Sequence, residues 1–151
     1  MMESETGIKF LFVGGGYLRT KLQEETQKHC LTNIVVRPYQ PRSRLKESLA
    51  LPNLHWASLN PRLEGYIVPS KVYGIAAAKR PLLMIGDQDG EIGRMLKEYG
   101  FGKCFLPGDS QGVVSFIHEV KARECSAELL GLRARRLIDE RAARVSAEQK
   151  W

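Results

Sequence analysis

The sequence predicts an α/β fold, a three-layer, doubly wound, Rossmann-like parallel sheet of about five strands. Short apolar runs rich in branched and aromatic residues alternate with longer amphipathic segments, which is the order of strands and helices in a parallel sheet. With 151 residues and 43% hydrophobic content, the chain can bury the core of one domain but not of two. No internal repeat or low-complexity linker interrupts the alternation.

The first strand is expected over Ile8 to Val13, and the glycine turn that follows it leads into a helix over Tyr17 to His29. The other apolar runs predict strands over Asn33 to Arg37, Leu54 to Leu59, Leu82 to Ile85 and Lys103 to Leu106. Helical patterns cover Arg42 to Leu51, Ser70 to Ala78, Glu91 to Tyr99 and Gln111 to Arg123. We therefore expect a disordered N-terminus over 1–7, one Rossmann-like domain over 8–125 and a basic C-terminal helix over 126–151.

Composition bounds the partners and the compartment. A formal charge of +6 and a pI near 9.4 favour an anionic partner, which is a phosphorylated ligand, an acidic membrane surface or nucleic acid. The three cysteines form no C-x-x-C pair and the three histidines are far apart in the sequence, so neither a disulfide framework nor a metal site is predicted. The polar N-terminus and the lack of a bilayer-length apolar run favour a reduced, cytoplasmic setting.

Five segments carry a resemblance to a known family. They are, in order, FLFVGGGYLRTKL, NIVVRPYQPRSRLKESL, LHWASLNP, VPSKVYGIAAAKRPLLMIG and DGEIGRML. In this order they resemble the C-terminal, donor-binding domain of GT-B fold glycosyltransferases, and most of all the bacterial branch with a Pro-Ser-Lys signature that builds capsule, O-antigen or colanic-acid-type exopolysaccharide. The resemblance covers about Ile8 to Leu137. It implies a retaining transfer from a UDP- or GDP-linked sugar to a glycan or lipid-linked acceptor, without a metal or other cofactor, in the cytoplasm or at the inner face of the membrane.

The Pro-Ser-Lys signature is expected at the start of a helix. Pro69 lacks an N–H where none is needed, Ser70 is suited to cap the first N–H groups, and the helix dipole favours an anion there. Lys71 then adds a positive charge for a departing diphosphate, which the resemblance implies as its catalytic role. From the residues alone, a simple cap and a solvated lysine explain the same pattern.

Glu64 and Gly65 resemble the start of the family's Glu-x7-Glu motif, which implies a catalytic or sugar-binding role for Glu64. The chain departs from that motif, because Gly74 stands where the second glutamate is usual. It departs again at Lys79, where the family has a glycine. A glycine lets a helix end in a left-handed turn, so we expect lysine to end this helix less favourably.

Two further groups of residues are expected at the donor site. Asp89, Gly90 and Glu91 follow a predicted strand and begin a helix, so we expect them near the donor sugar, although helix capping by Asp89 explains the same residues. The resemblance implies that a second group, at the ends of the first two strands, borders the phosphates and the nucleobase. This group consists of Gly14, Gly15, Arg37, Tyr39 and Gln40.

Domains of this family begin with one more strand and helix, which this sequence is expected to lack, together with the N-terminal acceptor-binding half. A separately encoded partner that supplies this half and a decayed gene fragment are both open explanations. Because the absent strand is central in the usual order, we expect the first and third strands to pair directly in the order 2-1-3-4-5. The alternative is that a strand of another polypeptide fills the vacancy.

Two other functions fit parts of the sequence. A Rossmann module that binds NADP would use the glycine turn, with Arg37 on the 2′-phosphate, but Arg19 replaces the third fingerprint glycine. A non-catalytic interaction module would use the arginine-rich C-terminal helix to contact a transferase, a membrane or nucleic acid. Acidic residues interleave those arginines and base-stacking aromatic residues are absent there, which favours an ion-paired helix face and disfavours nucleic acid.

Overall fold

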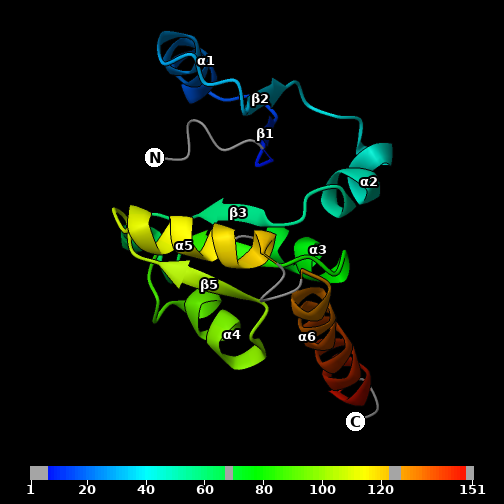
Figure 1. The fold of residues 1–151 in the computed structure, drawn as a ribbon. Coiled ribbons are helices and arrows are strands. Elements are labelled where there is room, and N and C mark those ends of the chain that lie inside the picture. Colours follow the sequence, from blue (N-terminus) through cyan, green and yellow to red (C-terminus); the bar gives the residue numbers. More distant parts are fainter. Residues whose placement is uncertain (1–6, 67–69, 123–126, 149–151) are drawn as a thin grey trace. The chain divides into compact units, whose positions relative to one another are not determined.

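The computed structural model describes residues 7–66, 70–122 and 127–148, with side chains up to Arg141 in the last range. The expected disordered N-terminus lies outside these residues except for Gly7. Parallel strands alternate with helices throughout, which confirms the α/β class (Figure 1). The chain divides into two compact units, Met1–Leu45 and Lys46–Trp151, and each has its own parallel sheet.

The first unit is a small β-α-β arrangement. Strand β1 (Phe10–Val13) leads through the glycine turn into α1 (Leu18–Lys28), and β2 (Ile34–Arg37) pairs with β1 in parallel. A short 3-10 turn, η1 (Arg42–Arg44), follows. None of the residues 7–45 is buried.

The second unit contains the remaining elements, beginning with α2 (Leu45–Ala50) at the boundary. The order along the chain is β3 (His55–Ser58), η2 (Pro61–Leu63), α3 (Lys71–Ala77), β4 (Leu82–Ile85), α4 (Glu91–Tyr99), β5 (Gly102–Phe105), α5 (Ser110–Lys121) and α6 (Ala127–Glu148). The three strands form a parallel sheet in the order β3-β4-β5. No described helix combines the length and the apolar composition needed to cross a bilayer.

The core of the second unit lies on both faces of this sheet. Leu82 and Met84 of β4 belong to a buried cluster that also includes side chains of α3, α4 and α6. On the opposite face, Phe105 packs against Phe116 of α5, with ring centroids 6.0 Å apart. Figure 1 shows α4 and α5 on opposite sides of the sheet. Because β4 is central and covered on both faces, its residues are apolar without alternation.

The pairings 2-1 and 3-4-5 of the expected strand order are both present among the described residues. Pairing of the first strand with the third would join the two units, and it stays a prediction.

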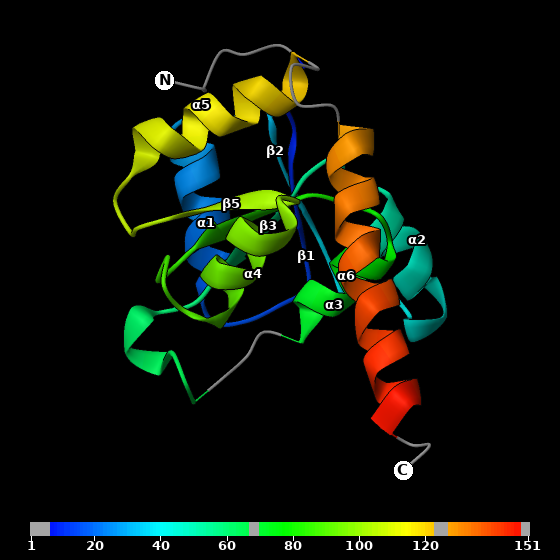
Figure 2. The same cartoon turned by 90° about the horizontal axis from the view of Figure 1, so that it is seen from below.

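Helix α6 packs closely on the end of α3, as Figures 1 and 2 show. Lys79 follows α3 with φ 56°, so the helix ends in a left-handed turn although lysine stands where the family has glycine. The N–H groups of Lys79 and Arg80 donate to carbonyls of the last turn of α3, which is a Schellman motif. Gly131 of α6 lies against this turn, where a Cβ would be 2.2 Å from the Lys79 carbonyl oxygen. A side chain at Gly131 would therefore push α6 away from α3.

Candidate functional site

The loops that follow β3 and β4 place the predicted sugar-binding residues at one edge of the second sheet. Glu64 follows η2, which comes after β3, and Gly90 and Glu91 begin α4, which comes after β4. Since the two strands are parallel neighbours, their carboxyl ends share an edge. This edge is where ligands bind in open α/β sheets.

Glu64 caps helix α4. Its Oε1 accepts a hydrogen bond of 2.7 Å from the Glu91 N–H, so a carboxylate occupies the positive end of the helix dipole. Gly90 is the N-cap residue and makes the contact possible, because a Cβ at this position would lie 2.4 Å from Glu64 Cδ. The structure therefore brings Glu64, Gly90 and Glu91 into direct contact.

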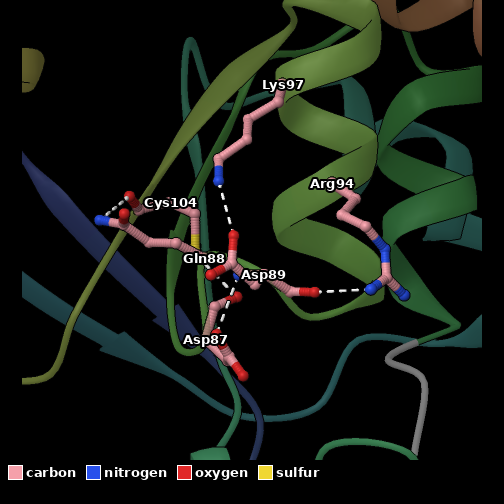
Figure 3. Close-up of polar contacts among 6 residues, drawn as sticks. All are labelled: Asp87, Gln88, Asp89, Arg94, Lys97 and Cys104. Atoms are coloured by element: carbon pink, nitrogen blue, oxygen red, sulfur yellow. Dashed lines mark hydrogen bonds and ion pairs between the residues drawn. The ribbon is translucent and has the colours of Figure 1, made fainter.

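Asp89 does not cap α4, and that interpretation is wrong. The Asp89 N–H donates to Asp87 Oδ1 at 2.9 Å, while Asp89 Oδ1 lies 2.9 Å from Lys97 Nζ (Figure 3). Lys97 holds the pKa of the Asp89 carboxyl below its usual value, first through this hydrogen bond and then through its charge. The turn made by Asp87 leaves Asp89 two residues before the first helical residue, Glu91, with its carboxylate beside Lys97.

Side chains of α4 and β5 hold the loop after β4 in place (Figure 3). Gln88 Nε2 donates to the Cys104 carbonyl at 3.2 Å, and Cys104 Sγ donates to the Asp87 carbonyl at 3.6 Å. Burial raises the pKa of the Cys104 thiol, so it keeps the proton that it donates. Arg94 Nη1 donates to the Asp89 carbonyl at 2.8 Å. Gly93 is required as well, because a Cβ there would lie 2.3 Å from the Gln88 carbonyl oxygen.

Two residues near Glu91 were missed by the sequence reasoning. The Tyr73 hydroxyl donates to Glu91 Oε1 at 3.3 Å, and the Arg141 guanidinium lies over the Tyr73 ring with Cζ 4.4 Å from its centroid. Tyr73 lies two residues after Lys71 in the resembling segment, which was a usable signal. Arg141 is far away along the chain, and no local pattern distinguishes it from the other arginines of α6.

The Pro-Ser-Lys signature differs in detail from the expectation. Pro69 lies outside the described residues. Ser70 precedes α3 but makes no side-chain capping bond, so the predicted cap is wrong. Its backbone is helical, with φ −55° and ψ −22°, whereas a capping serine needs an extended backbone to reach the N–H groups. Lys71 is exposed at the first position of a helix of only seven residues. Gly65, in the preceding loop, has a left-handed backbone with φ 82°.

The second predicted group lies entirely in the first unit. Gly14, with φ 132°, and Gly15 lie against the ring of Tyr39, where added Cβ atoms would be 3.2 Å and 3.1 Å from ring carbons. The Gly14 N–H donates to the Arg37 carbonyl at 3.0 Å, and Gln40 donates to a neighbouring backbone carbonyl. The structure thus gathers this group around the glycine turn. That this group and Glu64 belong to one donor site stays a prediction.

Ion pairs form along the arginine-rich helix α6, as the interleaved acidic residues indicated. Arg135 pairs with Asp139, and Arg136 pairs with Glu140, each four residues along the helix. Among the described residues, no group of three or more His, Cys, Asp or Glu is arranged to hold a metal ion. The ring of His55 bonds to the Leu49 carbonyl at 2.8 Å, which is a structural contact.

Comparison with known proteins reveals one informative similarity. The chain is 31% identical over 127 residues to "Probable glycosyltransferase WbjE" of Pseudomonas aeruginosa. The chain is similar to a glycosyltransferase. The match covers 82% of this chain and 30% of that relative, so the chain spans less than a third of the relative's length. No family model matches the chain. The similarity supports a glycosyltransferase-like function and extends to no particular donor or acceptor.

Proposed function

We propose that the chain is the donor-binding part of a retaining, nucleotide-sugar-dependent glycosyltransferase of the GT-B type. The observation that carries the proposal is the similarity to the probable glycosyltransferase WbjE over 82% of this chain. The fold agrees with it, because parallel sheets bind nucleotides at the carboxyl ends of their strands. Since the chain spans 30% of that relative, the acceptor is proposed to bind to another part of the enzyme or to a partner half.

The two glutamates at the start of α4 suit the sugar. Glu64 Oε1 is held by the Glu91 N–H, and Glu64 Oε2 accepts no hydrogen bond from the described part of the chain. A carboxylate held in this way presents a fixed acceptor to sugar hydroxyl groups. In the proposed reaction, Glu64 and Glu91 orient the sugar while its bond to the diphosphate breaks.

Lys71 is proposed to stabilise the departing diphosphate. The α3 helix is short, so its dipole contributes less than a longer helix would, and the mobile ammonium of Lys71 becomes the main cation of the signature. Negative charge on the diphosphate grows as the glycosidic bond breaks, and a nearby cation lowers the barrier by stabilising it. No metal is required for this role.

The nucleotide end of the donor is proposed to meet the glycine turn of the first unit. The ring of Tyr39 lies over Gly14 and Gly15 on one side, yet Tyr39 is 78% exposed. An exposed aromatic face stacks favourably on a nucleobase. The neighbouring backbone from Arg37 to Gln40 supplies donors and acceptors, which suits a uridine or guanosine diphosphate.

A ligand panel tests the proposed function. UDP, GDP and their sugar conjugates are added to the full chain in a thermal-shift measurement, with NADPH as the ligand of the competing interpretation. One nucleoside diphosphate series should raise the melting temperature, since a ligand at one hundred times its Kd adds about 2.7 kcal/mol of stability. Stabilisation by NADPH alone, or by no member of the panel, contradicts the proposal.

The role of Lys71 is tested by calorimetry on the ligand that the panel identifies. Lys71→Ala should weaken binding of the nucleoside diphosphate by about 1–3 kcal/mol, as for loss of a charge-assisted contact. Lys103→Ala is the matched control, because Lys103 is ion-paired with Glu119 on α5. Equal affinities of the Lys71 variant and the parent would remove Lys71 from the site.

A further inference from the structure

A network of four residues connects the C-terminal helix to the candidate site. Arg141 of α6 lies over the ring of Tyr73 of α3, and the Tyr73 hydroxyl donates to Glu91 Oε1. The Glu91 N–H donates to Glu64 Oε1. The network Arg141–Tyr73–Glu91–Glu64 therefore runs from α6, through α3, to the two carboxylates at the start of α4.

The network compensates the two like charges. Carboxylates that share a helix start repel each other unless each has a donor or a nearby cation. Glu64 has the backbone N–H and the helix dipole, while Glu91 has the Tyr73 hydroxyl. The Arg141 guanidinium adds a positive charge over the tyrosine ring. Specific donors, rather than packing, thus set the direction of the Glu91 carboxylate.

Folding alone does not need this network. The contact between α3 and α6 rests on buried apolar residues, including Val72, Ala134 and Leu137, which are at most 2% exposed. Arg141 is exposed, and exposed charged contacts contribute little to stability.

Burial raises the pKa of the Tyr73 hydroxyl, and Glu91 raises this pKa while Arg141 lowers it, so the hydroxyl remains a donor at neutral pH.

We propose that Tyr73 and Arg141 are positioning residues that direct the Glu91 carboxylate toward the hydroxyl groups of a donor sugar, so that α6 forms part of the sugar subsite. This inference rests on the proposed function. Loss of the tyrosine hydroxyl leaves Glu91 free to rotate, and a carboxylate that rotates binds a sugar hydroxyl less well. The nucleoside diphosphate does not contact Glu91 in this arrangement, so its affinity is independent of the network.

Calorimetry with paired ligands separates these effects in the full chain. UDP is compared with UDP-glucose, and GDP with GDP-mannose. Tyr73→Phe and Arg141→Gln should each weaken binding of the nucleotide sugar about five- to tenfold, as for loss of one hydrogen bond, and change binding of the nucleoside diphosphate by less than about twofold. Arg141→Lys, which keeps the charge but loses the planar stack, should recover part of the loss.

The chain offers a matched control at the other end of α4. The Tyr99 hydroxyl donates to Glu140 Oε2 of α6 at 3.0 Å, so it also joins a helix to α6 through a carboxylate. Tyr99→Phe removes an equivalent bond away from Glu91 and should leave both affinities unchanged. If Tyr99→Phe lowers sugar-nucleotide affinity as much as Tyr73→Phe does, the effect is general loosening of α6 and the inference is wrong.

Two outcomes distinguish the inference from the proposed function. If the parent binds nucleotide sugars but the network variants weaken both ligand classes equally, or neither, the inference fails and the proposed function stands. If the parent binds neither class, the proposed function and the sugar assignment both fail. The positioning of Glu91 then has its own readout, the side-chain carboxyl resonance of 13C-labelled Glu91. Tyr73→Phe should shift it, Tyr99→Phe should not, and an unmoved resonance in Tyr73→Phe overturns the positioning role.

Discussion

The two compact units are built from the same kinds of elements but differ in burial. Both contain parallel strands of four residues joined through helices. In the first unit, Leu11, Phe12 and Val13 of β1 are 40–46% exposed, whereas Leu82 and Leu83 of β4 are fully buried. A two-stranded sheet with one helix has too few layers to enclose its apolar side chains. The difference teaches that the same local pattern yields a core only where helices cover the sheet on both faces.

The largest expected effect contrasts one phenylalanine from each unit. Phe101→Ala removes a ring that is 0% exposed and should lower the free energy of unfolding by about 3–5 kcal/mol. Phe12→Ala removes a ring that is 44% exposed and should lower it by about 1 kcal/mol or less. Urea denaturation measures both, with far-UV circular dichroism for the helices and strands of both units and tryptophan fluorescence for the second unit, which contains Trp56. Comparable losses would contradict the difference in burial between the units.

A smaller effect is expected where α6 meets α3. Gly131→Ala places a Cβ 2.2 Å from the Lys79 carbonyl oxygen, so α6 must shift and stability should fall by about 1–3 kcal/mol. Leu132→Ala, at the next position of the same helix, alters a side chain that is 61% exposed. We expect it to change stability by no more than about 0.5 kcal/mol. The same denaturation measurement compares the two variants, and a neutral Gly131→Ala would show that the close approach is not required.

Two residues with a left-handed backbone, one in each unit, allow a matched test of stability. Lys79 has φ 56° after α3 and Cys30 has φ 51° after α1, and in both places glycine relieves the strain of a side chain. Lys79→Gly should raise the stability of the second unit by about 0.5–1 kcal/mol. Cys30→Gly should leave the fluorescence-detected transition of that unit unchanged. An equal gain from both variants would mean that the units unfold together.

The smallest effect at neutral pH involves His55. Burial lowers the pKa of His55 below 6.5, although its bond to the Leu49 carbonyl opposes this shift. The unfolded chain therefore takes up a proton on this ring at higher pH than the folded chain does, and stability falls as the pH drops below about 6.5. His55→Gln should make this loss shallower in urea denaturation from pH 7 to 5. His29→Gln in the first unit serves as the control, and an identical slope in parent and His55→Gln would contradict the prediction.

Element positions were predictable because they depend on neighbours along the chain. The strand from Leu82 to Ile85 and the helix from Glu91 to Tyr99 have the predicted bounds. Branched apolar runs and helical periodicity reflect local backbone preference and one-sided burial, which a single sequence displays. The left-handed turn at Lys79 was not predicted, because lysine stands where a glycine would mark such a turn.

Capping was predicted less well, because several side chains compete for the same N–H groups. Ser70 and Asp89 stand where local rules favour caps, yet neither caps its helix. Glu64 caps α4 from 27 positions away along the chain. The choice depends on backbone angles and on which carboxylate reaches the helix start, and both follow from tertiary packing.

The sequence by itself determined the α/β class and the order of the strands and helices along the chain. It also determined which acidic and basic residues follow the carboxyl ends of the strands. Only the tertiary structure decided that β4 is central in its sheet, that Glu64 occupies the start of α4, and that Arg141 reaches Glu91 through Tyr73. Local preferences act over a few residues, whereas strand pairing and long-range side-chain contacts depend on the balance of burial and charge between segments far apart in the chain.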